Sequence, residues 1–155
     1  MIKVVKGNLL NATEKVIAHQ VNCQKKMYSG VAKTIRENYP IVFDIYKQTE
    51  PQMGLAYFVY DAYDCDYKNK HHIVNMYAQN MYGYDGLQYT DYEAFKKCCK
   101  SIVETCKHIE RNSDEKCDVA MPYKIASDRG GADWDTIMDI LLEEFTDVDL
   151  TLYKL

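Results

Sequence analysis

Long apolar runs are missing from this sequence of 155 residues. A segment that crosses a bilayer needs about 20 consecutive apolar residues, and no stretch approaches that length. The amino terminus, Met1 to Lys6, already has the character of a strand, which argues against a secretory signal peptide. The sequence therefore predicts a cytoplasmic protein that does not insert into membranes.

Metal-binding patterns are missing as well. The six cysteines form no CxxC pair, and no His-x₃₋₅-His pair accompanies them. The adjacent His71 and His72 would point to opposite faces of a strand, a poor arrangement for sharing one ion. Cys99 and Cys106 stand at helical spacing among apolar residues, which predicts buried, reduced thiols that behave as small hydrophobes. We expect neither a metal ion nor another cofactor.

The sequence also lacks an excess of positive charge. The net charge is −4, from 19 Lys and Arg against 23 Asp and Glu, and the two signs are interleaved. A protein that binds long nucleic acid usually presents a basic face to replace the counterions of the phosphates. Adjacent lysines occur only at Lys25-Lys26 and Lys96-Lys97. The composition argues against long nucleic acid as a partner and leaves a single nucleotide open.

Neither a low-complexity tract nor a Gly/Ser-rich linker divides the chain, so we expect one domain over residues 1–155. Six segments rich in β-branched and aromatic residues predict strands. Ser29 and Pro40 suit the starts of two helices, Thr90 to Glu93 has the pattern of a capping box, and Asp133 precedes a last amphipathic helix. Strands that alternate with helices predict an α/β fold whose sheet is covered on both faces. The predicted strands are Ile2–Lys6, Val16–Val21, 55–60, 72–77, 117–121 and 150–153.

Small, polar and glycine residues follow three of these strands, at 7–9, 22–32 and 122–131. Ligands of open α/β sheets bind outside the carboxyl ends of the strands. The second and third segments both end at a predicted helix start, where free backbone N–H groups and a partial positive charge favour an anion. The three segments together predict a cleft for a nucleotide diphosphate.

The order and spacing of these segments resemble macrodomains. The resemblance rests on VKGNLL at 5–10, IAHQVNC at 17–23, SGVA at 29–32, residues 82–92 and the last strand, and it covers nearly the whole chain. Within the superfamily, the chain is similar to the Appr-1-p processing family, in particular to ADP-ribose-1''-phosphate phosphatases and their phage-borne relatives. The fold that this implies is a three-layer α/β/α sandwich with a central mixed sheet of about six strands.

The resemblance also implies a ligand-binding set. Gly7, Asn8 and Leu9 would meet the adenine. Macrodomains generally carry Asp at the place of Asn8, whose amide oxygen can still accept from the adenine amino group. Asn22 would contact the distal ribose, and two loops would wrap the ribose and the diphosphate. Their implied members are Ser29, Gly30, Val31, Ala32, Ile125, Ala126, Ser127, Asp128, Arg129 and Gly130.

Catalytic roles are implied for His19, Asn22 and Asp85. His19 would relay a proton or orient a water, and Asp85 would activate that water as a base. The alternative is that His19 is a satisfied interior histidine and that Asp85 forms a turn before Gly86. Gln20 is excluded, because a regular strand points it away from His19.

Two loops depart from the family pattern. Ala126, Ser127 and Asp128 stand where relatives tend to carry Gly-Cys-Gly, and the carboxylate of Asp128 would repel a diphosphate unless Arg129 neutralises it. Lys25-Lys26 and Tyr28 replace smaller residues in the other loop. They could close over an anionic ligand, block the usual pose or simply be solvated.

We therefore predict that the chain binds ADP-ribose or a close derivative and hydrolyses it, as an ADP-ribose-1''-phosphate phosphatase or an ADP-ribosyl hydrolase. The departures from the family pattern in these two loops leave open the alternative that the chain binds its ligand without catalysis. It would then recognise an ADP-ribosylated macromolecule or sequester a nucleotide. A third interpretation, an interaction protein, rests on the 14 tyrosines, of which Tyr77, Tyr82, Tyr84 and Tyr89 lie near the predicted cleft mouth. We expect a monomer.

Overall fold

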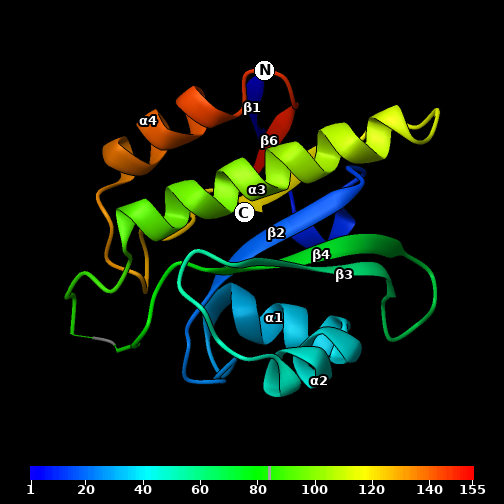
Figure 1. Ribbon diagram of the computed structural model, residues 1–155. Coiled ribbons are helices and arrows are strands. Elements are labelled where there is room, and N and C mark those ends of the chain that lie inside the picture. Colours follow the sequence, from blue (N-terminus) through cyan, green and yellow to red (C-terminus); the bar gives the residue numbers. More distant parts are fainter. Residues whose placement is uncertain (84) are drawn as a thin grey trace.

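A single sheet of six strands lies between two pairs of helices in the computed structural model, which describes residues 1–83 and 85–155 (Figure 1). Most predicted elements agree with the structure to within two residues at each end, as the periodicity of their apolar residues allows. The strands are β1 (Ile2–Lys6), β2 (Val16–Val21), β3 (Ala56–Tyr63), β4 (Lys70–Tyr77), β5 (Val119–Pro122) and β6 (Leu150–Lys154). The helices are the 3-10 turn η1 (Leu9–Asn11), α1 (Gly30–Asn38), α2 (Pro40–Gln48), α3 (Tyr92–Arg111) and α4 (Trp134–Glu144).

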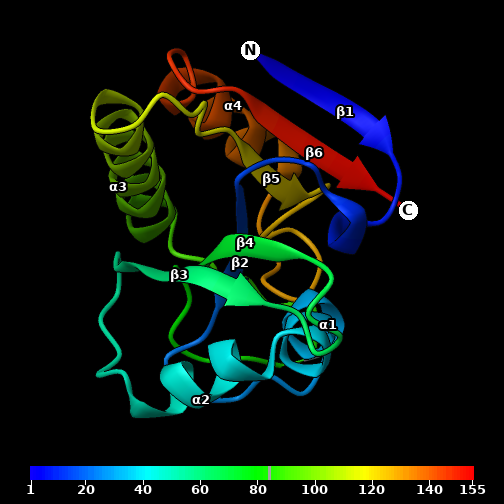
Figure 2. The same cartoon turned by 90° about the vertical axis from the view of Figure 1, so that its right-hand side faces the viewer.

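The strands are ordered β1-β6-β5-β2-β4-β3, and every neighbouring pair is parallel except β3 with β4. Helices α3 and α4 cover one face of the sheet, and α1 and α2 cover the other (Figures 1 and 2). The predicted three-layer α/β/α sandwich with a mixed sheet is therefore confirmed. Since β2 and β5 are parallel neighbours, the two loops that follow them leave the sheet at the same edge.

Strand β2 has a separate core on each face, because successive side chains of a strand alternate. Val16 and Ala18 pack with the apolar side of α3, and Ile17 packs with Ile35 and Val42 of α1 and α2. Each fully buried aliphatic side chain of this kind stabilises the fold by roughly 1.5–3 kcal/mol. The double burial holds the end of β2 in a fixed position beneath the loops.

The start of α3 differs from the predicted capping box. Asp91 is the N-cap, and its carboxylate accepts from the backbone N–H of Ala94 at 3.0 Å. The hydroxyl of Thr90 instead donates to the carbonyl oxygen of Ala126 at 3.0 Å. Asp is as good an N-cap as Thr, so the helix begins one residue later than the pattern indicated. Thr90 is thereby free to hold a distant loop.

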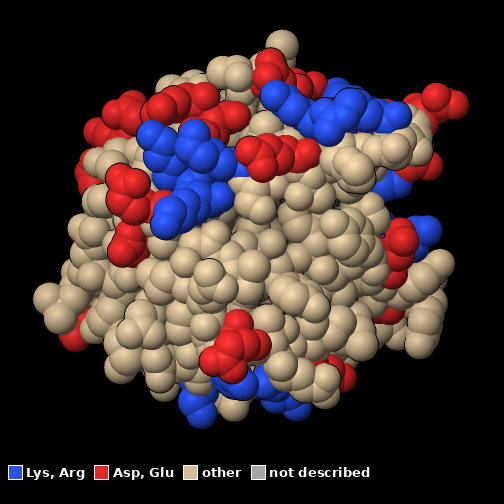
Figure 3. Space-filling model, in the orientation of Figure 1, with Lys and Arg blue, Asp and Glu red and all other residues tan. Residues whose placement is uncertain are grey.

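Ion pairs join α3 to α4 and the loop that follows α4. Lys96 lies 3.2 Å from Glu143, Lys100 lies 2.9 Å from Glu144, and Lys107 lies 2.7 Å from Asp147. On the face drawn in Figure 3, groups of basic side chains accordingly lie next to groups of acidic ones. The two pairs whose side chains are both solvent-accessible, Lys96–Glu143 and Lys107–Asp147, contribute at most about 1 kcal/mol each, so packing of the apolar faces dominates this contact.

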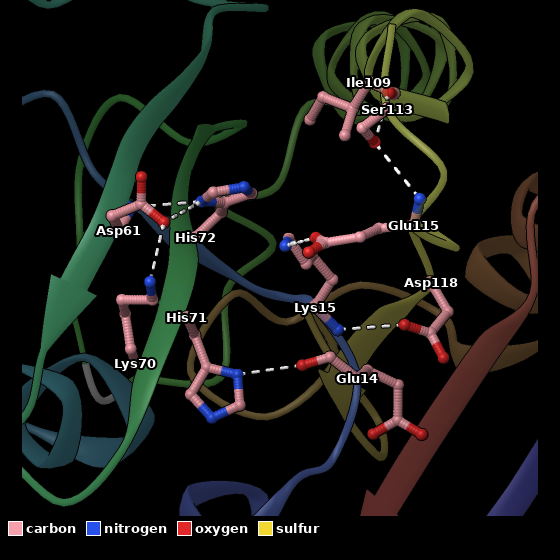
Figure 4. Close-up of polar contacts among 10 residues, drawn as sticks. All are labelled: Glu14, Lys15, Asp61, Lys70, His71, His72, Ile109, Ser113, Glu115 and Asp118. Carbon is pink, nitrogen blue, oxygen red and sulfur yellow. Dashed lines mark hydrogen bonds and ion pairs between the residues drawn. The ribbon is translucent and has the colours of Figure 1, made fainter. Parts of the chain in front are cut away.

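A polar cluster lies at the amino-terminal ends of β2 and β4 (Figure 4). This end of the sheet is opposite to the loops that follow β2 and β5. His71 donates from Nδ1 to the carbonyl oxygen of Glu14 at 2.8 Å, and His72 accepts at Nδ1 from the backbone N–H of Asp61 at 3.0 Å. Lys15 pairs with Glu115. Burial lowers the pKa of both histidines, so each is neutral in the folded protein at pH 7.

None of the described helices combines the length and the apolar character that a bilayer crossing requires. Within residues 1–83 and 85–155, no three His, Cys, Asp or Glu side chains converge as a metal site. Cys99 and Cys106 are buried free thiols in the core beneath α3, as predicted.

Candidate functional site

A cleft of about 190 Å³ opens at the carboxyl ends of β2 and β5. It lies between the start of α1 and the loop that follows β5, so it brings together residues that are about one hundred positions apart in sequence. Eleven of the predicted site residues line it: His19, Asn22, Ser29, Gly30, Val31, Ala32, Ile125, Ala126, Asp128, Arg129 and Gly130. Lys26, Tyr123 and Lys124, from the two loops predicted to form the cleft, and Tyr82, expected near its mouth, line it as well, whereas the sequence reasoning missed Gln20 and Gln79.

The loop between β2 and α1 is held by Asn22, which is only 8% exposed. Its side-chain oxygen accepts from the backbone N–H of Gln24 at 2.9 Å, and the hydroxyl of Tyr46 donates to its backbone carbonyl oxygen at 2.5 Å. Its side-chain nitrogen donates to the carbonyl oxygen of Lys26 at 3.0 Å. Asn22 therefore organises this loop, and its second amide hydrogen is what it can still offer to a ligand.

Helix α1 begins without a side-chain cap. Ser29 has the extended backbone of an N-cap residue (φ −152°, ψ 161°), but its side chain makes no capping hydrogen bond. The N–H groups of a helix's first turn have no partner inside the helix. Since Ser29, Gly30, Val31 and Ala32 line the cleft, these donors and the positive end of the helix dipole face it. Gly30 has φ 59°, which suits glycine and adds no side chain there.

The loop after β5 approaches from the other side in a strained conformation. Lys124 and Ala126 both adopt left-handed backbone angles, with φ 63° and 68°. Left-handed non-glycine residues cost about 1–3 kcal/mol each and cluster at binding sites. The carbonyl oxygen of Gly130 holds the loop by accepting from the N–H groups of Tyr89 at 2.8 Å and Thr90 at 2.9 Å.

This conformation leaves backbone donors in the cleft. Among the described residues, none accepts a hydrogen bond from the N–H of Ala126, Asp128 or Gly130. Lys26, Lys124 and Arg129 line the same cleft as Asp128, so cationic side chains outnumber the acid. Two sets of backbone amides without a partner among the described residues, one from each loop, therefore belong to residues that line a single cleft with a net positive lining.

His19 lies at the bottom of the cleft and is only 1% exposed. Its Nε2 is 2.7 Å from the side-chain oxygen of Asn75, which can only accept, so Nε2 carries the hydrogen. Within the described part of the chain, Nδ1 has no partner. Burial lowers the pKa of His19 to about 4, against a weaker opposing effect of the Asn75 hydrogen bond. His19 therefore offers a neutral acceptor and is a poor acid at pH 7.

The buried histidines predict a loss of stability in mild acid. His19 titrates near 6.5 when unfolded and at about 4 when folded, so below pH 6.5 the unfolded state binds more protons. We expect the free energy of unfolding to fall by about 2 kcal/mol from pH 7 to pH 5 through His19 alone, with His71 and His72 adding to the slope. Denaturant melts of wild type and His19→Gln across this range measure it. His108→Gln, at an exposed position on α3, serves as the control and should keep the wild-type slope.

Gln20 also lines the cleft, which corrects its exclusion. It does point to the opposite face of β2 from His19, as a regular strand requires. At the carboxyl end of the strand, however, the cleft opens on both faces, towards α1 on one side and towards the loop after β5 on the other. The alternation of the strand is therefore no ground for excluding its last residues.

Five of the predicted residues do not line this cleft: Gly7, Asn8, Leu9, Ser127 and Asp85. Asn8 is the N-cap of η1, where its side chain accepts from the N–H of Leu10 at 3.0 Å, and Leu9 is part of the core. Asp85 accepts from the hydroxyl of Tyr89 at 2.8 Å, and this bond lowers the pKa of Asp85. The structure therefore does not bring Asp85 together with His19.

The tyrosines fall into different environments. Tyr28 is 56% exposed at the cleft rim, and its ring lies 5.0 Å from the guanidinium of Arg36. Tyr82 lines the cleft, whereas Tyr77 is buried against Tyr46. Tyr84 lies outside the described residues. Cation–π contact with Arg36 fixes Tyr28 at the rim and leaves part of its ring accessible.

The fold is that of the macrodomains. The macrodomain of Mycobacterium tuberculosis DarG superposes with a TM-score of 0.79 over 99% of this chain and 97% of its own, at 22% identity. Thermosipho africanus DarTG in complex with ADP-ribose superposes with a TM-score of 0.75 over 99% of this chain and 42% of its own, at 15% identity. At these identities the likeness shows the fold.

A sequence relative places the chain more narrowly. An uncharacterized 17.5 kDa protein from the tk-vs intergenic region of Enterobacteria phage T4 is 31% identical over 148 residues, which cover 91% of this chain and 88% of that protein. No family model matches the sequence. The chain belongs to the same family as this phage protein.

Proposed function

We propose that this macrodomain binds ADP-ribose, or a close derivative of it, in the cleft between β2 and β5. The observation that carries the proposal is the pair of donor sets that face each other there. The uncapped start of α1 offers amides from one side, and the loop after β5 offers those of Ala126, Asp128 and Gly130 from the other. Two linked phosphates match two facing donor sets, and a helix start is a recurrent phosphate site.

The carboxylate of Asp128 in this cleft is compatible with the proposal. A carboxylate in contact with a phosphate costs about 4 kcal/mol at the effective dielectric of a protein surface. Asp128 is exposed, however, which screens its charge, and Lys26, Lys124 and Arg129 line the same cleft. A neighbour in structure, the Thermosipho africanus protein, was solved in complex with ADP-ribose. The cleft residues of this chain support the same ligand.

Calorimetric titration with ADP-ribose tests the proposal. We expect saturable binding, with weaker binding of ADP and weaker still of AMP, because each loses groups that the cleft contacts. The affinity should fall in high salt only modestly, since the donors are largely backbone amides rather than exposed lysines. A titration in which ADP-ribose produces neither heat nor a shift in melting temperature would refute the proposal.

Hydrolysis is a second proposed function, which one observation supports. Nδ1 of His19 has no partner among the described residues, and His19 is one of the residues that line the cleft, so a water or a hydroxyl that reached Nδ1 would find an acceptor for its hydrogen. With its pKa at about 4, His19 would act as a neutral acceptor throughout the physiological range. Turnover of ADP-ribose-1''-phosphate should then be independent of pH from 6 to 8 as far as His19 is concerned, and His19→Phe should abolish it. Release of inorganic phosphate is the measurement. Binding without phosphate release assigns the chain to the non-catalytic alternative.

A further inference from the structure

A second pocket, of about 550 Å³, lies between α2 and the edge strand β3. It also includes the turn that joins β3 to β4, at the right of Figure 1. Apolar side chains of α2 and β3 line it, among them Ile41, Ile45 and Val59. Among the described residues, none lines both this pocket and the cleft between β2 and β5. The second pocket is therefore a separate candidate site.

Three tyrosines of β3 and its turn line this pocket and stay accessible to solvent. Tyr60, Tyr63 and Tyr67 are 55%, 48% and 79% exposed, and the ring centres of Tyr63 and Tyr67 lie 5.8 Å apart. Tyr67 has φ 55°, a left-handed backbone that is unfavourable for a bulky side chain. Burial of apolar surface does not explain this conformation, because most of the Tyr67 ring is exposed. Strained residues of this kind cluster at binding sites.

The lining of the second pocket is negatively charged. Asp61 and Asp64 belong to it, and its described residues include no lysine, arginine or histidine. Asp64 accepts from the backbone N–H of Lys68 at 2.9 Å and from the side-chain amide of Asn69 at 2.8 Å. Both donor groups are uncharged, so they hold the carboxylate in place without neutralising it. The complementary ligand group is a cation.

A cation of the chain itself lies beside the pocket in such surroundings. The ammonium of Lys70 lies 3.7 Å from the carboxylate of Asp61 and 5.8 Å from the ring centre of Tyr63. A cation near both a ring face and a carboxylate is attracted by each of them. Both side chains of this ion pair are about half exposed, which makes the pair weak. A cation that fits the pocket better can therefore displace Lys70.

We propose that this pocket is a docking site for an arginine side chain on a basic segment of a partner protein. A planar guanidinium stacks on tyrosine rings and forms paired hydrogen bonds with a carboxylate, whereas an ammonium is a compact, strongly hydrated charge. The apolar side chains of α2 suit the methylene stem of arginine. The inference goes beyond the proposed function, because it concerns a different surface and a different ligand.

Titration with hexa-arginine, hexalysine and hexaglutamate peptides tests this inference. We expect saturable binding of hexa-arginine, weaker binding of hexalysine and no binding of hexaglutamate. The double variant Asp61→Asn/Tyr67→Asn should bind hexa-arginine roughly tenfold more weakly, because it removes one carboxylate and one ring. Asparagine tolerates the positive φ of both positions, 51° and 55°, so we expect the variant to keep the wild-type fold.

Glu104→Gln is the control, because it changes the net charge by the same amount at an exposed position of α3. It should keep the wild-type affinity for hexa-arginine within a factor of about two, since solvent screens a distant charge. Equal affinities of the control and the double variant would show that the peptide responds to net charge alone and would overturn the inference. Hexalysine that binds as tightly as hexa-arginine would overturn it too, as would a wild type that binds neither. The experiment contains no ADP-ribose, so its result is independent of the proposed function.

Discussion

Replacing Gly130 by Ala should weaken ADP-ribose binding by roughly 100-fold, because the added methyl group overpacks a site with no room for it. A Cβ at this position would collide with the carbonyl oxygen of Ala126 and the hydroxyl of Thr90, and it would lie 2.9 Å from the side-chain nitrogen of Gln20. All three atoms belong to one hydrogen-bonded chain that fixes the loop after β5, in which Gln20 donates to Thr90 and Thr90 donates to Ala126. The loop must shift, and its amides then no longer face the start of α1. Isothermal titration measures the loss.

Gly86→Ala is the control for this variant. Gly86 has φ 76°, so an alanine there is strained, but nothing lies within 4 Å of its Cβ. The control should therefore lose some stability, about 1 kcal/mol, and keep the wild-type affinity within a factor of about two. If Gly130→Ala binds ADP-ribose as tightly as Gly86→Ala does, the loop after β5 is not part of the binding site.

The sequence was sufficient to predict the fold and the two loops that form the cleft. Strands β1 and β2 were predicted to the residue, since their β-branched residues are bounded by glycine, asparagine and polar residues. The starts of α1, α2 and α4 followed from Ser29, Pro40 and Asp133, each of which has a local physical preference for a helix start. Local signals of this kind need no knowledge of what packs where.

The contacts inside the cleft could not be predicted, because they depend on distant residues. Thr90 was assigned to a helix cap and instead holds Ala126, a residue 36 positions away. Gln20 was excluded by strand alternation, which does not say where the sheet ends and the cleft begins. Gln79 lies two residues after the end of β4, and this position near a strand end is a signal in the sequence that points to the cleft.

The side chain of Asp85 shows the same limit in another form. The turn before Gly86 was readable from sequence, and the backbone N–H of Leu87 does donate to the Asp85 carboxylate at 3.2 Å. Its stronger partner, the hydroxyl of Tyr89, lies four residues away in a loop whose path the sequence does not fix. A catalytic role for Asp85 would require this hydrogen bond to be exchanged for one to a water in the cleft.

Replacing Ser29 by Asp should stabilise the fold and abolish ligand binding at the same time. Asp91 and Asp133 already cap α3 and α4 by accepting from the N–H groups of Ala94 and Thr136, whereas the side chain of Ser29 caps nothing. An aspartate at this extended position can accept from the first turn of α1 and complement its dipole. We expect about 1 kcal/mol of added stability, which corresponds to a rise of roughly 3 °C in melting temperature.

The same carboxylate would occupy the amides proposed to hold the diphosphate and would repel its charge. We expect the affinity for ADP-ribose to fall by roughly 100-fold, which calorimetry measures alongside the melting temperature. Thr34→Asp adds the same charge at an exposed position one turn further along α1, and it should weaken binding by less than about threefold, since solvent screens it. Opposite signs for stability and affinity distinguish an anion site from a simple packing defect, because damage to the fold would lower both. A Ser29→Asp variant that melts higher and still binds ADP-ribose with wild-type affinity would show that the start of α1 does not hold the phosphates.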